Sequence, residues 1–293
     1  NLDRTLVVVS SKSGTTVEPL SVFRHLWREI SPVLEAPGER FVAVTDPGTP
    51  LADRARELGF RALLEGPPEV GGRFSALSVF GLLPAALLGV DLARLLGTAR
   101  AERQACRRSE SNPGLELGAL LGEAAAAGRT KLTLLASPEL AAFPDWIEQL
   151  VAESTGKDGR GIVPVVDEPL GAVSEYGHDR LFVVLALEGE ARGPRDELAD
   201  ALADAGHPVA RIELYDPYFL GGEIFRWEVA TAMAAEVLGV HPFNQPDVQR
   251  AKELAREALG GDEPGDGTVA TAETAEEVRR WLDDTAPGHY LAV

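Results

Sequence analysis

The sequence predicts an α/β protein built from two doubly wound units in tandem, each with a parallel sheet. Short apolar runs rich in β-branched residues alternate with longer segments of helical periodicity along most of the 293 residues. A polar segment with Pro and Gly, residues 109–114, interrupts this alternation, which then starts again. Alternating strands and helices are typical of parallel sheets covered by helices on both faces, and the interruption indicates two such sheets.

The first unit carries three predicted strands, each followed by helical sequence. A strand–loop–helix that would normally precede Leu6 in such a unit is missing, and the chain begins with Asn1 rather than Met. We therefore expect the first unit to be truncated at its N-terminus, as a piece of a longer polypeptide. The predicted strands are 6–9, 41–45 and 61–64, and the predicted helices are 19–30, 51–58, 76–89 and 91–106.

The second unit repeats the alternation and ends in a helical tail. The acidic, Gly-rich segment 260–267 reads as a linker. We expect domain borders of 1–110, 111–245 and 246–293, the last range being a C-terminal helical segment and tail. The predicted strands are 132–136, 162–166, 181–187 and 209–214, and the predicted helices are 115–127, 138–152, 194–205, 221–238, 246–259 and 273–284.

The composition excludes several classes of protein. The formal net charge of −18 disfavours nucleic acid and anionic membrane as partners, because both attract cationic surfaces. The single cysteine, Cys106, cannot form a disulfide within the chain and fits a reducing cytoplasm. We find no apolar run long enough to span a bilayer. The sequence therefore predicts a cytoplasmic protein whose partner is a small molecule.

The segment 11–16, of sequence SKSGTT, lies between a predicted strand and a predicted helix. A helix N-terminus offers unpaired backbone N–H groups and the positive end of the helix dipole, so it attracts anions. Four hydroxyl side chains add donors at the same place, and Gly14 lets the backbone approach a ligand. An ordinary capped turn is the alternative, since Ser and Thr cap many helices. The density of hydroxyls favours a site for a phosphate monoester.

Four separate stretches point to one family. They are SKSGTT at 11–16, GGRFS at 71–75, ESTGK at 153–157 and PFNQP at 242–246, the last followed by Lys252. In order and approximate spacing they resemble the glucose-6-phosphate isomerase family, which is built from two sugar-isomerase (SIS) domains. The amino-acid sequence between these stretches is most similar to the isomerase part of bacterial transaldolase/glucose-6-phosphate isomerase fusions. The resemblance implies two tandem SIS-type domains and runs from about Leu6 to about Leu259.

The resemblance also implies roles for individual residues. Glu153 matches the catalytic base, Arg73 matches the arginine that faces the enediolate, and Lys252 matches the lysine that works with the ring oxygen. A Glu closing a surface helix, an ion-paired Arg and a solvated Lys are the structural alternatives for these three. The substrate-binding positions implied are Ser11, Lys12, Ser13, Thr15, Thr16, Gly72, Gln149 and Gln245.

The sequence departs from the family pattern at the group that opens the sugar ring. Many members place a histidine after a Gly-rich turn, and the comparable position here is Glu223. His241, directly before the PFNQP stretch, is the other candidate in the chain, and a histidine from a neighbouring subunit is a third. Asn244 replaces the commoner Asp. The second serine-bearing glycine loop of the family's phosphate site would lie before Asn1.

The function implied is an aldose–ketose isomerase that interconverts D-glucose 6-phosphate and D-fructose 6-phosphate through an enediolate. We expect no cofactor and no metal, since one Cys and scattered His make no zinc site and no dinucleotide fingerprint follows a strand. The family's dimers make a homodimer plausible. Two alternatives remain at this point: an isomerase that also uses mannose 6-phosphate, and a non-catalytic module that binds sugar phosphates.

Overall fold

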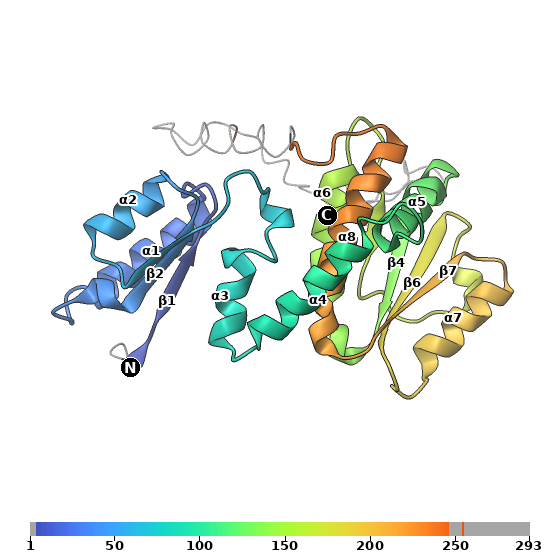
Figure 1. Cartoon of the computed structure of the whole chain (residues 1–293), viewed down its shortest axis with the longest axis horizontal. Coiled ribbons are helices and arrows are strands. Elements are labelled where there is room, and N and C mark those ends of the chain that lie inside the picture. The colour runs from blue at the N-terminus through green and yellow to red at the C-terminus, as the bar shows by residue number, and fades with distance from the viewer. Residues whose placement is uncertain (1–3, 246–253, 255–293) are drawn as a thin grey trace, which may run out of the picture. The chain divides into compact units, whose positions relative to one another are not determined.

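The computed structural model describes residues 4–245 and Leu254. The chain divides into two compact units, residues 1–244 and 245–293. Within the first unit lie two separate parallel sheets with helices between the strands, which confirms the predicted α/β fold (Figure 1). The predicted helices 246–259 and 273–284 lie outside the described residues. The predicted domain borders at 110 and 245 stay predictions.

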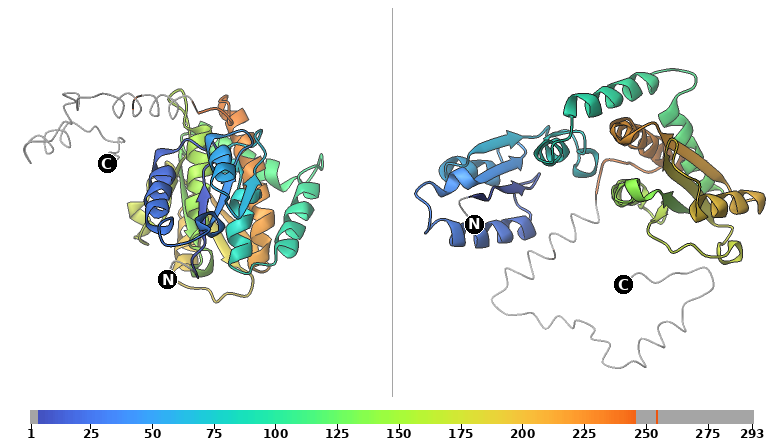
Figure 2. Two further views of the ribbon diagram at one scale, coloured as in Figure 1. Left: turned by 90° about the vertical axis from the view of Figure 1, so that its left-hand side faces the viewer. Right: turned by 90° about the horizontal axis from the view of Figure 1, so that it is seen from below.

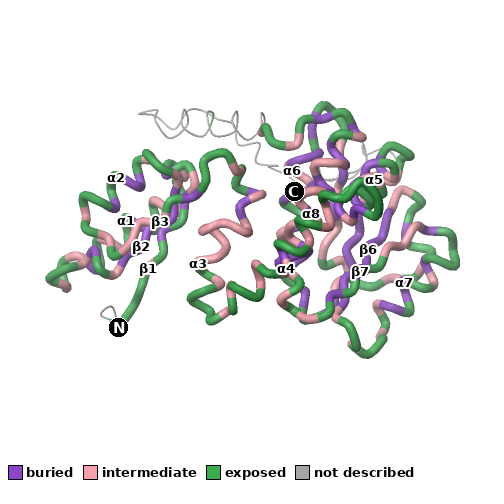
Figure 3. The backbone as a smooth tube through the Cα atoms, in the orientation of Figure 1, coloured by how far each residue is buried: buried purple, intermediate pink, exposed green. Residues whose placement is uncertain are grey.

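The first sheet has three parallel strands in the order β1-β2-β3. They are β1 (Val7–Ser10), β2 (Phe41–Thr45) and β3 (Ala62–Glu65). Every residue of β2 is buried because this strand lies between the other two (Figure 3). Their carboxyl ends lie at one edge of the sheet, so the loops that follow the three strands start from that edge.

Two helices cover one face of this sheet. Phe23 and Ile30 of α1 (Val17–Ile30) and Leu51 of α2 (Pro50–Glu57) share a core with Phe41 of β2. Four aromatic rings, Phe23, Trp27, Phe41 and Phe60, contact one another in this core with centroids 5.2–6.2 Å apart. Contacts of β2 with α3 (Val79–Leu87) add to these.

The second sheet has four parallel strands in the order β5-β4-β6-β7. They are β4 (Lys131–Ala136), β5 (Val163–Val165), β6 (Arg180–Leu187) and β7 (Val209–Leu214). The chain leaves β4 toward β5 and then returns past β4 to add β6 on the other side. The order of the strands therefore reverses between β4 and β6, which is where open α/β sheets commonly bind ligands.

Helices cover both faces of this second sheet (Figure 1 and Figure 2). α5 (Pro113–Ala126), α6 (Phe143–Thr155) and α8 (Leu220–Leu238) enclose the largest core on one face. α7 (Pro194–Asp204) packs on the other face against Phe182 and Val184. Three glycines of α5 allow α8 to approach closely, because an added Cβ would lie within 2.5–2.7 Å of Val229, Ala230 or Val237.

α4 (Leu92–Ala105) precedes the predicted border near residue 110, yet it packs against α8 beyond that border. Short 3₁₀ helices complete the description: η2 (Pro37–Arg40), η3 (Gly72–Phe74), η4 (Pro138–Leu140), η5 (Val173–Glu175) and η6 (Pro217–Phe219). The predicted helix 138–152 is instead η4 followed by α6. In the part of the chain that the structure describes, no helix is both long and apolar enough to cross a membrane.

Candidate active site

Arg73 is held in place by neutral acceptors. It lies in η3, after the last strand of the first sheet, and only 2% of its side chain is exposed. Its Nε donates to the hydroxyl of Ser154 at 2.7 Å. Its Nη2 donates to the carbonyl oxygens of Pro242 at 2.5 Å and Asn244 at 3.2 Å. These hydrogen bonds fix the guanidinium without cancelling its charge.

Glu153 is the carboxylate that meets this guanidinium. It lies in the last turn of α6, and its Oε2 is 3.6 Å from Nη1 of Arg73. Gln149, one turn earlier, donates its Nε2 to Oε1 of Glu153 at 3.1 Å. One third of the Glu153 side chain is exposed, so the carboxylate is oriented by protein groups but still accessible.

Lys157 is a second buried cation beside Arg73. Its Nζ donates to the carbonyl oxygen of Ser154 at 2.9 Å and to that of His241 at 2.6 Å. Burial lowers the pKa of Lys157, and the nearby charge of Arg73 lowers it further. Burial also lowers the pKa of Arg73, although the charge of Glu153 opposes that effect. The two cations attach the segment 241–244 to the end of α6.

Sequence reasoning assigned no role to Ser154 or Lys157, although both lie in the ESTGK stretch. Ser154 is fully buried, and its hydroxyl and carbonyl oxygen accept from Arg73 and Lys157 respectively. The sequence feature that could have pointed to them is that a small hydroxyl residue and a lysine follow the candidate base closely in the chain. Their partners are 81 and 84 residues away in sequence, and no local pattern reveals such contacts.

The segments around Arg73 leave room on one side. Phe74 packs against Phe243, with ring centroids 5.2 Å apart, and also against the large core. A Cβ added to Gly72 would meet no atom within 4 Å. The fold itself therefore does not require glycine there, which fits a position that a ligand approaches.

The SKSGTT segment lies at the carboxyl end of β1, as predicted from the sequence. Ser11 is buried and its hydroxyl donates to that of Thr16 at 3.0 Å. Ser13 and Thr15 are exposed and share a hydrogen bond of 2.9 Å. Thr16 precedes α1 without a side-chain bond to the helix, so this loop does not use its hydroxyl as a cap.

Two residues of this loop serve the loop itself. The ammonium of Lys12 lies 2.7 Å from both carboxylate oxygens of Asp46 and 2.9 Å from the carbonyl oxygen of Pro67. Its charge is therefore paired. Gly14 has φ +64°, and an added Cβ would lie 2.8 Å from Thr49 and 3.0 Å from the amide nitrogen of Leu51. We interpreted Gly14 as leaving space for a ligand; the structure shows that it leaves space for the next loop.

The structure does not bring Glu223 to Arg73 and Glu153 within one chain. Glu223 lies in the first turn of α8, whereas the segment that Arg73 contacts follows the end of that helix. At 1.5 Å per residue, Glu223 is about 22 Å from Leu238 along the axis. It lines a different cavity, of about 700 Å³, and pairs with Arg226 at 2.9 Å.

His241 does lie in the segment that meets this group of residues. Its Nδ1 accepts from the backbone N–H of Phe243 at 3.2 Å, and its own carbonyl accepts from Lys157. Gln245 is half-buried. Lys252 lies outside the described residues, so its role stays a prediction. Among the described residues, no group of three or more His, Cys, Asp or Glu side chains could hold a metal ion.

Curated relatives now identify the family, although no protein-family model matches the chain. A probable glucose-6-phosphate isomerase from Natronomonas pharaonis is 34% identical in an alignment of 319 positions. The alignment covers 95% of this chain and 72% of the relative. The chain belongs to the glucose-6-phosphate isomerase family. A second member, the glucose-6-phosphate isomerase of Rubrobacter xylanophilus, is 30% identical over 87% of this chain and 69% of its own length.

Two solved structures are similar to the chain in fold. A hypothetical protein from Thermus thermophilus has a TM-score of 0.80 at 29% identity, over 89% of this chain and 73% of its own. A glucose-6-phosphate isomerase from Chlamydia trachomatis has a TM-score of 0.65 at 22% identity, over 97% of this chain and 63% of its own, and shows the same fold. A fusion to transaldolase stays a prediction.

Proposed function

We propose that this protein interconverts D-glucose 6-phosphate and D-fructose 6-phosphate through an enediolate, without a cofactor or metal. The observation that carries the proposal is the pair formed by Glu153 and Arg73. A partly exposed carboxylate faces a buried guanidinium whose other hydrogen bonds go to uncharged oxygens. An acid–base step next to a developing negative charge needs these two groups side by side.

Glu153 acts in this proposal as the base. In the open-chain aldose it removes the proton from C2, and it then returns a proton to C1 of the enediolate, which gives the ketose. The hydrogen bond from Gln149 and the nearby guanidinium of Arg73 fix the direction of the carboxylate. A base positioned in this way contributes on the order of 10²–10⁴ to the rate.

Arg73 stabilises the charge that develops on O1 and O2 when the C2 proton leaves. Because its hydrogen bonds to Ser154, Pro242 and Asn244 are already formed, the guanidinium does not have to reorganise during the reaction. The interaction is stronger with the enediolate than with the neutral substrate. It therefore lowers the barrier rather than only the binding energy.

The loop 11–16 takes the phosphate group in this proposal. Ser13 and Thr15 offer exposed hydroxyls, and the first amides of α1 have no side-chain cap to satisfy them. Lys12 contributes by holding the loop against Asp46 rather than by a free charge. The contacts of Lys12 with Asp46 and Pro67 and the absence of a side-chain cap on α1 support these assignments.

His241 is the group proposed to open the sugar ring. Its Nδ1 accepts a backbone N–H, so the neutral imidazole carries its proton on Nε2, and this N–H can hydrogen-bond to the ring oxygen. As the bond between C1 and the ring oxygen breaks, water carries the proton of the C1 hydroxyl to the ring oxygen, which this hydrogen bond stabilises. Lys252 stays a second candidate. A homodimer, the domain borders 1–110, 111–245 and 246–293, and a cytoplasmic location are proposed alongside from the sequence.

An isomerase assay on the chain tests the proposal. Fructose 6-phosphate is converted in the presence of a dehydrogenase that oxidises glucose 6-phosphate, and mannose 6-phosphate is tested in parallel. Turnover of fructose 6-phosphate above a no-enzyme control is expected. Binding of fructose 6-phosphate without turnover would contradict the proposal and leave a sugar-phosphate-binding module.

A further inference from the structure

A cavity of about 350 Å³ lies at the carboxyl edge of the second sheet, away from Arg73 and Glu153. It is lined by residues that follow three different strands: Ser137 after β4, the segment 167–170 after β5, and Arg195 after β6. This is the place where the strand order reverses between β4 and β6. Its volume falls within the usual range of small-ligand sites.

Ser137 gives the cavity a buried donor without a partner. The residue is fully buried, and its backbone is fixed at both ends: its N–H donates to Leu185 and its carbonyl accepts from Leu140, each at 2.9 Å. Its hydroxyl, however, has no hydrogen-bond partner among the described residues. Leaving such a group unsatisfied costs about 1–3 kcal/mol, so a native protein rarely does so without a reason.

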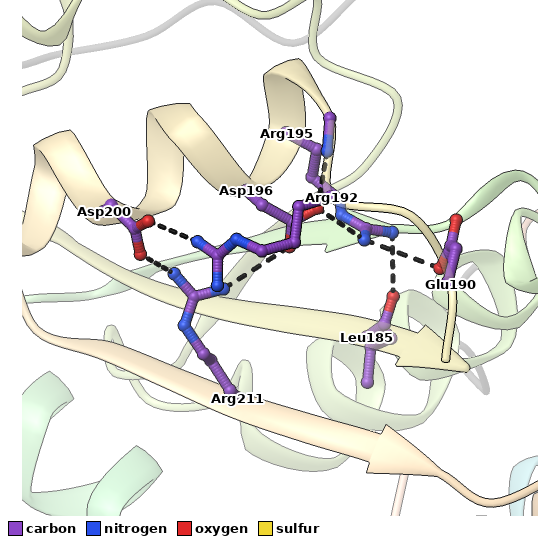
Figure 4. A network of polar contacts seen from close by, with 8 residues as sticks. Leu185, Glu190, Arg192, Arg195, Asp196, Asp200 and Arg211 are labelled. Atoms are coloured by element: carbon purple, nitrogen blue, oxygen red, sulfur yellow. Dashed lines mark hydrogen bonds and ion pairs between the residues drawn. The ribbon is translucent and has the colours of Figure 1, made fainter. Parts of the chain in front are cut away.

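Arg195 gives the cavity a second unpartnered donor, anchored at the same carbonyl. Its Nη1 donates to the carbonyl oxygen of Leu185 at 3.4 Å (Figure 4). The backbone N–H of Ser137 donates to the same oxygen, so the two residues are linked through one carbonyl group of β6. Its Nη2 donates to Asp196 at 2.9 Å and lies 3.5 Å from Glu190. Its Nε is buried and has no partner in the described part of the chain.

The charges around the cavity select the kind of ligand. Arg195 faces two carboxylates, Asp196 and Glu190, so its positive charge is already compensated. Burial alone would raise the pKa of Asp196, but hydrogen bonds from Arg195 and Gly193 lower it, which keeps Asp196 charged. Asp167 lines the cavity as a further carboxylate. A phosphate would therefore meet no uncompensated cation here.

Hydroxyl groups fit this set of partners. A hydroxyl can accept from Ser137 and from Nε of Arg195 while it donates to the carboxylate of Asp167. Glu168 also lines the cavity, but its carboxylate is paired with Arg180. Leu134, Pro138 and Leu170 are among the apolar walls and suit the C–H face of a sugar. We propose that this cavity is a second binding site, for a neutral polyhydroxylated molecule of about hexose size.

The site is distinct from the proposed active site but shares a helix with it. Pro144 at the start of α6 lines the cavity, and Glu153 lies near the end of the same helix. The two residues are about 14 Å apart at 1.5 Å per residue. Because the inference concerns binding, it can fail or hold independently of the isomerase proposal.

A titration followed by ¹⁵N–¹H NMR on the full chain tests the site, with D-sorbitol, D-glucose and inorganic phosphate as probes. Sorbitol cannot be isomerised, and saturating fructose 6-phosphate is present to occupy the proposed active site. We expect both neutral probes to shift the amides of residues 137–143 and 167–170, with millimolar affinity for a ligand of this size. Inorganic phosphate should leave these amides unchanged.

Ser137→Ala is the deciding variant. It should weaken sorbitol binding about three- to ten-fold, the value of one hydrogen bond, without lowering the melting temperature, since the hydroxyl has no partner in the protein. Thr231→Val is the matched control, because Thr231 is a second fully buried hydroxyl residue whose oxygen is unpartnered and which does not line the cavity. Unshifted amides, a response to phosphate alone, or equal affinity in both variants would overturn the proposal.

Discussion

An arginine lies next to a glutamate near the start of α8 and again beside the segment that follows α8, and the charge of the two arginines is compensated to different extents. At the start of the helix Arg226 is bound by two carboxylates, Glu102 at 2.7 Å and Glu223 at 2.9 Å. Beyond the end of the helix, Arg73 donates to three uncharged oxygens, and the carboxylate of Glu153 is 3.6 Å away. Burial acts to lower the pKa of both arginines, but carboxylates compensate the charge of Arg226 more closely than that of Arg73.

This difference distinguishes the pair at Arg226, which stabilises the fold, from the pair of Arg73 and Glu153, which is proposed to act on the substrate. Close contacts with two carboxylates compensate the charge of Arg226 within the protein, and these contacts raise its pKa although burial opposes them. Arg73 keeps a positive charge for a ligand because neutral acceptors hold it. Glu223 is almost fully buried, whereas Glu153 is one-third exposed and can reach a substrate. The residue types alone therefore do not predict the role of an Arg–Glu pair; the other contacts of the two residues are needed.

The largest effect is expected from Glu153→Gln. The amide keeps the shape of the side chain but cannot accept the C2 proton, so kcat should fall by about 10²–10⁴ while the affinity for fructose 6-phosphate stays within a few-fold. Steady-state kinetics and calorimetric binding measure the two quantities. Glu102→Gln, which removes a carboxylate of α4 from its pair with Arg226 near the start of α8, is the control and should leave kcat unchanged. Loss of binding together with turnover in Glu153→Gln would mean that this residue is misassigned.

Arg73→Lys should come next. A lysine carries one side-chain nitrogen, which cannot occupy the positions of both Nε and Nη2, so the contacts with Ser154 and Pro242 are not both kept. The charge beside Glu153 then shifts, and kcat should fall by about 10²–10³. Arg226→Lys breaks the corresponding pair at the start of α8. It should lower the melting temperature and leave kcat intact. Equal losses of kcat in the two variants would remove the distinction between the two ends of α8.

A smaller effect is expected from Gly72→Ala. The added methyl meets open space in the protein, so stability should not change, but the methyl should obstruct the substrate and raise KM about ten-fold. Gly14→Ala makes the contrast, since φ +64° and the contacts with Thr49 and Leu51 predict a lower melting temperature. Kinetics and thermal unfolding of both variants measure this. An unchanged KM in Gly72→Ala would place the substrate elsewhere.

Glu223→Gln should change activity least, by less than about two-fold, and alter stability instead. Burial raises the pKa of Glu223 to about 7 in the folded protein, against about 4.3 when unfolded. The folded state gains from the neutral carboxyl below about pH 4.3, and this gain is lost as the pH rises through 7. The variant should therefore be more stable than the parent above pH 7, by about 3 kcal/mol.

Denaturant unfolding at pH 5 and pH 8 measures this difference, which should be small at pH 5 and large at pH 8. Some pH dependence should remain in the variant, because burial also raises the pKa of Glu228 to about 8. A loss of turnover in Glu223→Gln would instead support our alternative that this carboxyl opens the sugar ring.

The order of strands and helices could be predicted because it is encoded locally. The apolar run 41–45 is a buried central strand, and the turn residues after it mark its end. The pairing of Arg73 with Glu153 followed only from the family resemblance. The contacts that fix Arg73 could not be predicted, since they go to a side-chain hydroxyl and to backbone carbonyls far along the chain.

Distances in the fold bear on two further predicted residues, whose roles stay predictions. Glu223 matched the family position in sequence, but the length of α8 separates it from Glu153 in one chain. Lys12 belongs to the motif, yet Asp46, which follows a neighbouring strand, pairs its charge. The role proposed for Glu153 also departs from the rule that parallel sheets bind ligands at their carboxyl edge. This residue ends the helix that leads to β5, and so lies toward the amino edge of the second sheet.

A crystal structure of the Glu153→Gln variant with fructose 6-phosphate would show whether Glu153 and Arg73 face the reacting carbons of the sugar. The variant should hold the sugar without converting it. The account predicts the phosphate at Ser13, Thr15 and the first turn of α1, with C1 and C2 between residue 153 and the guanidinium of Arg73. A sugar phosphate bound elsewhere, with its C1 and C2 out of reach of both residues, would contradict it.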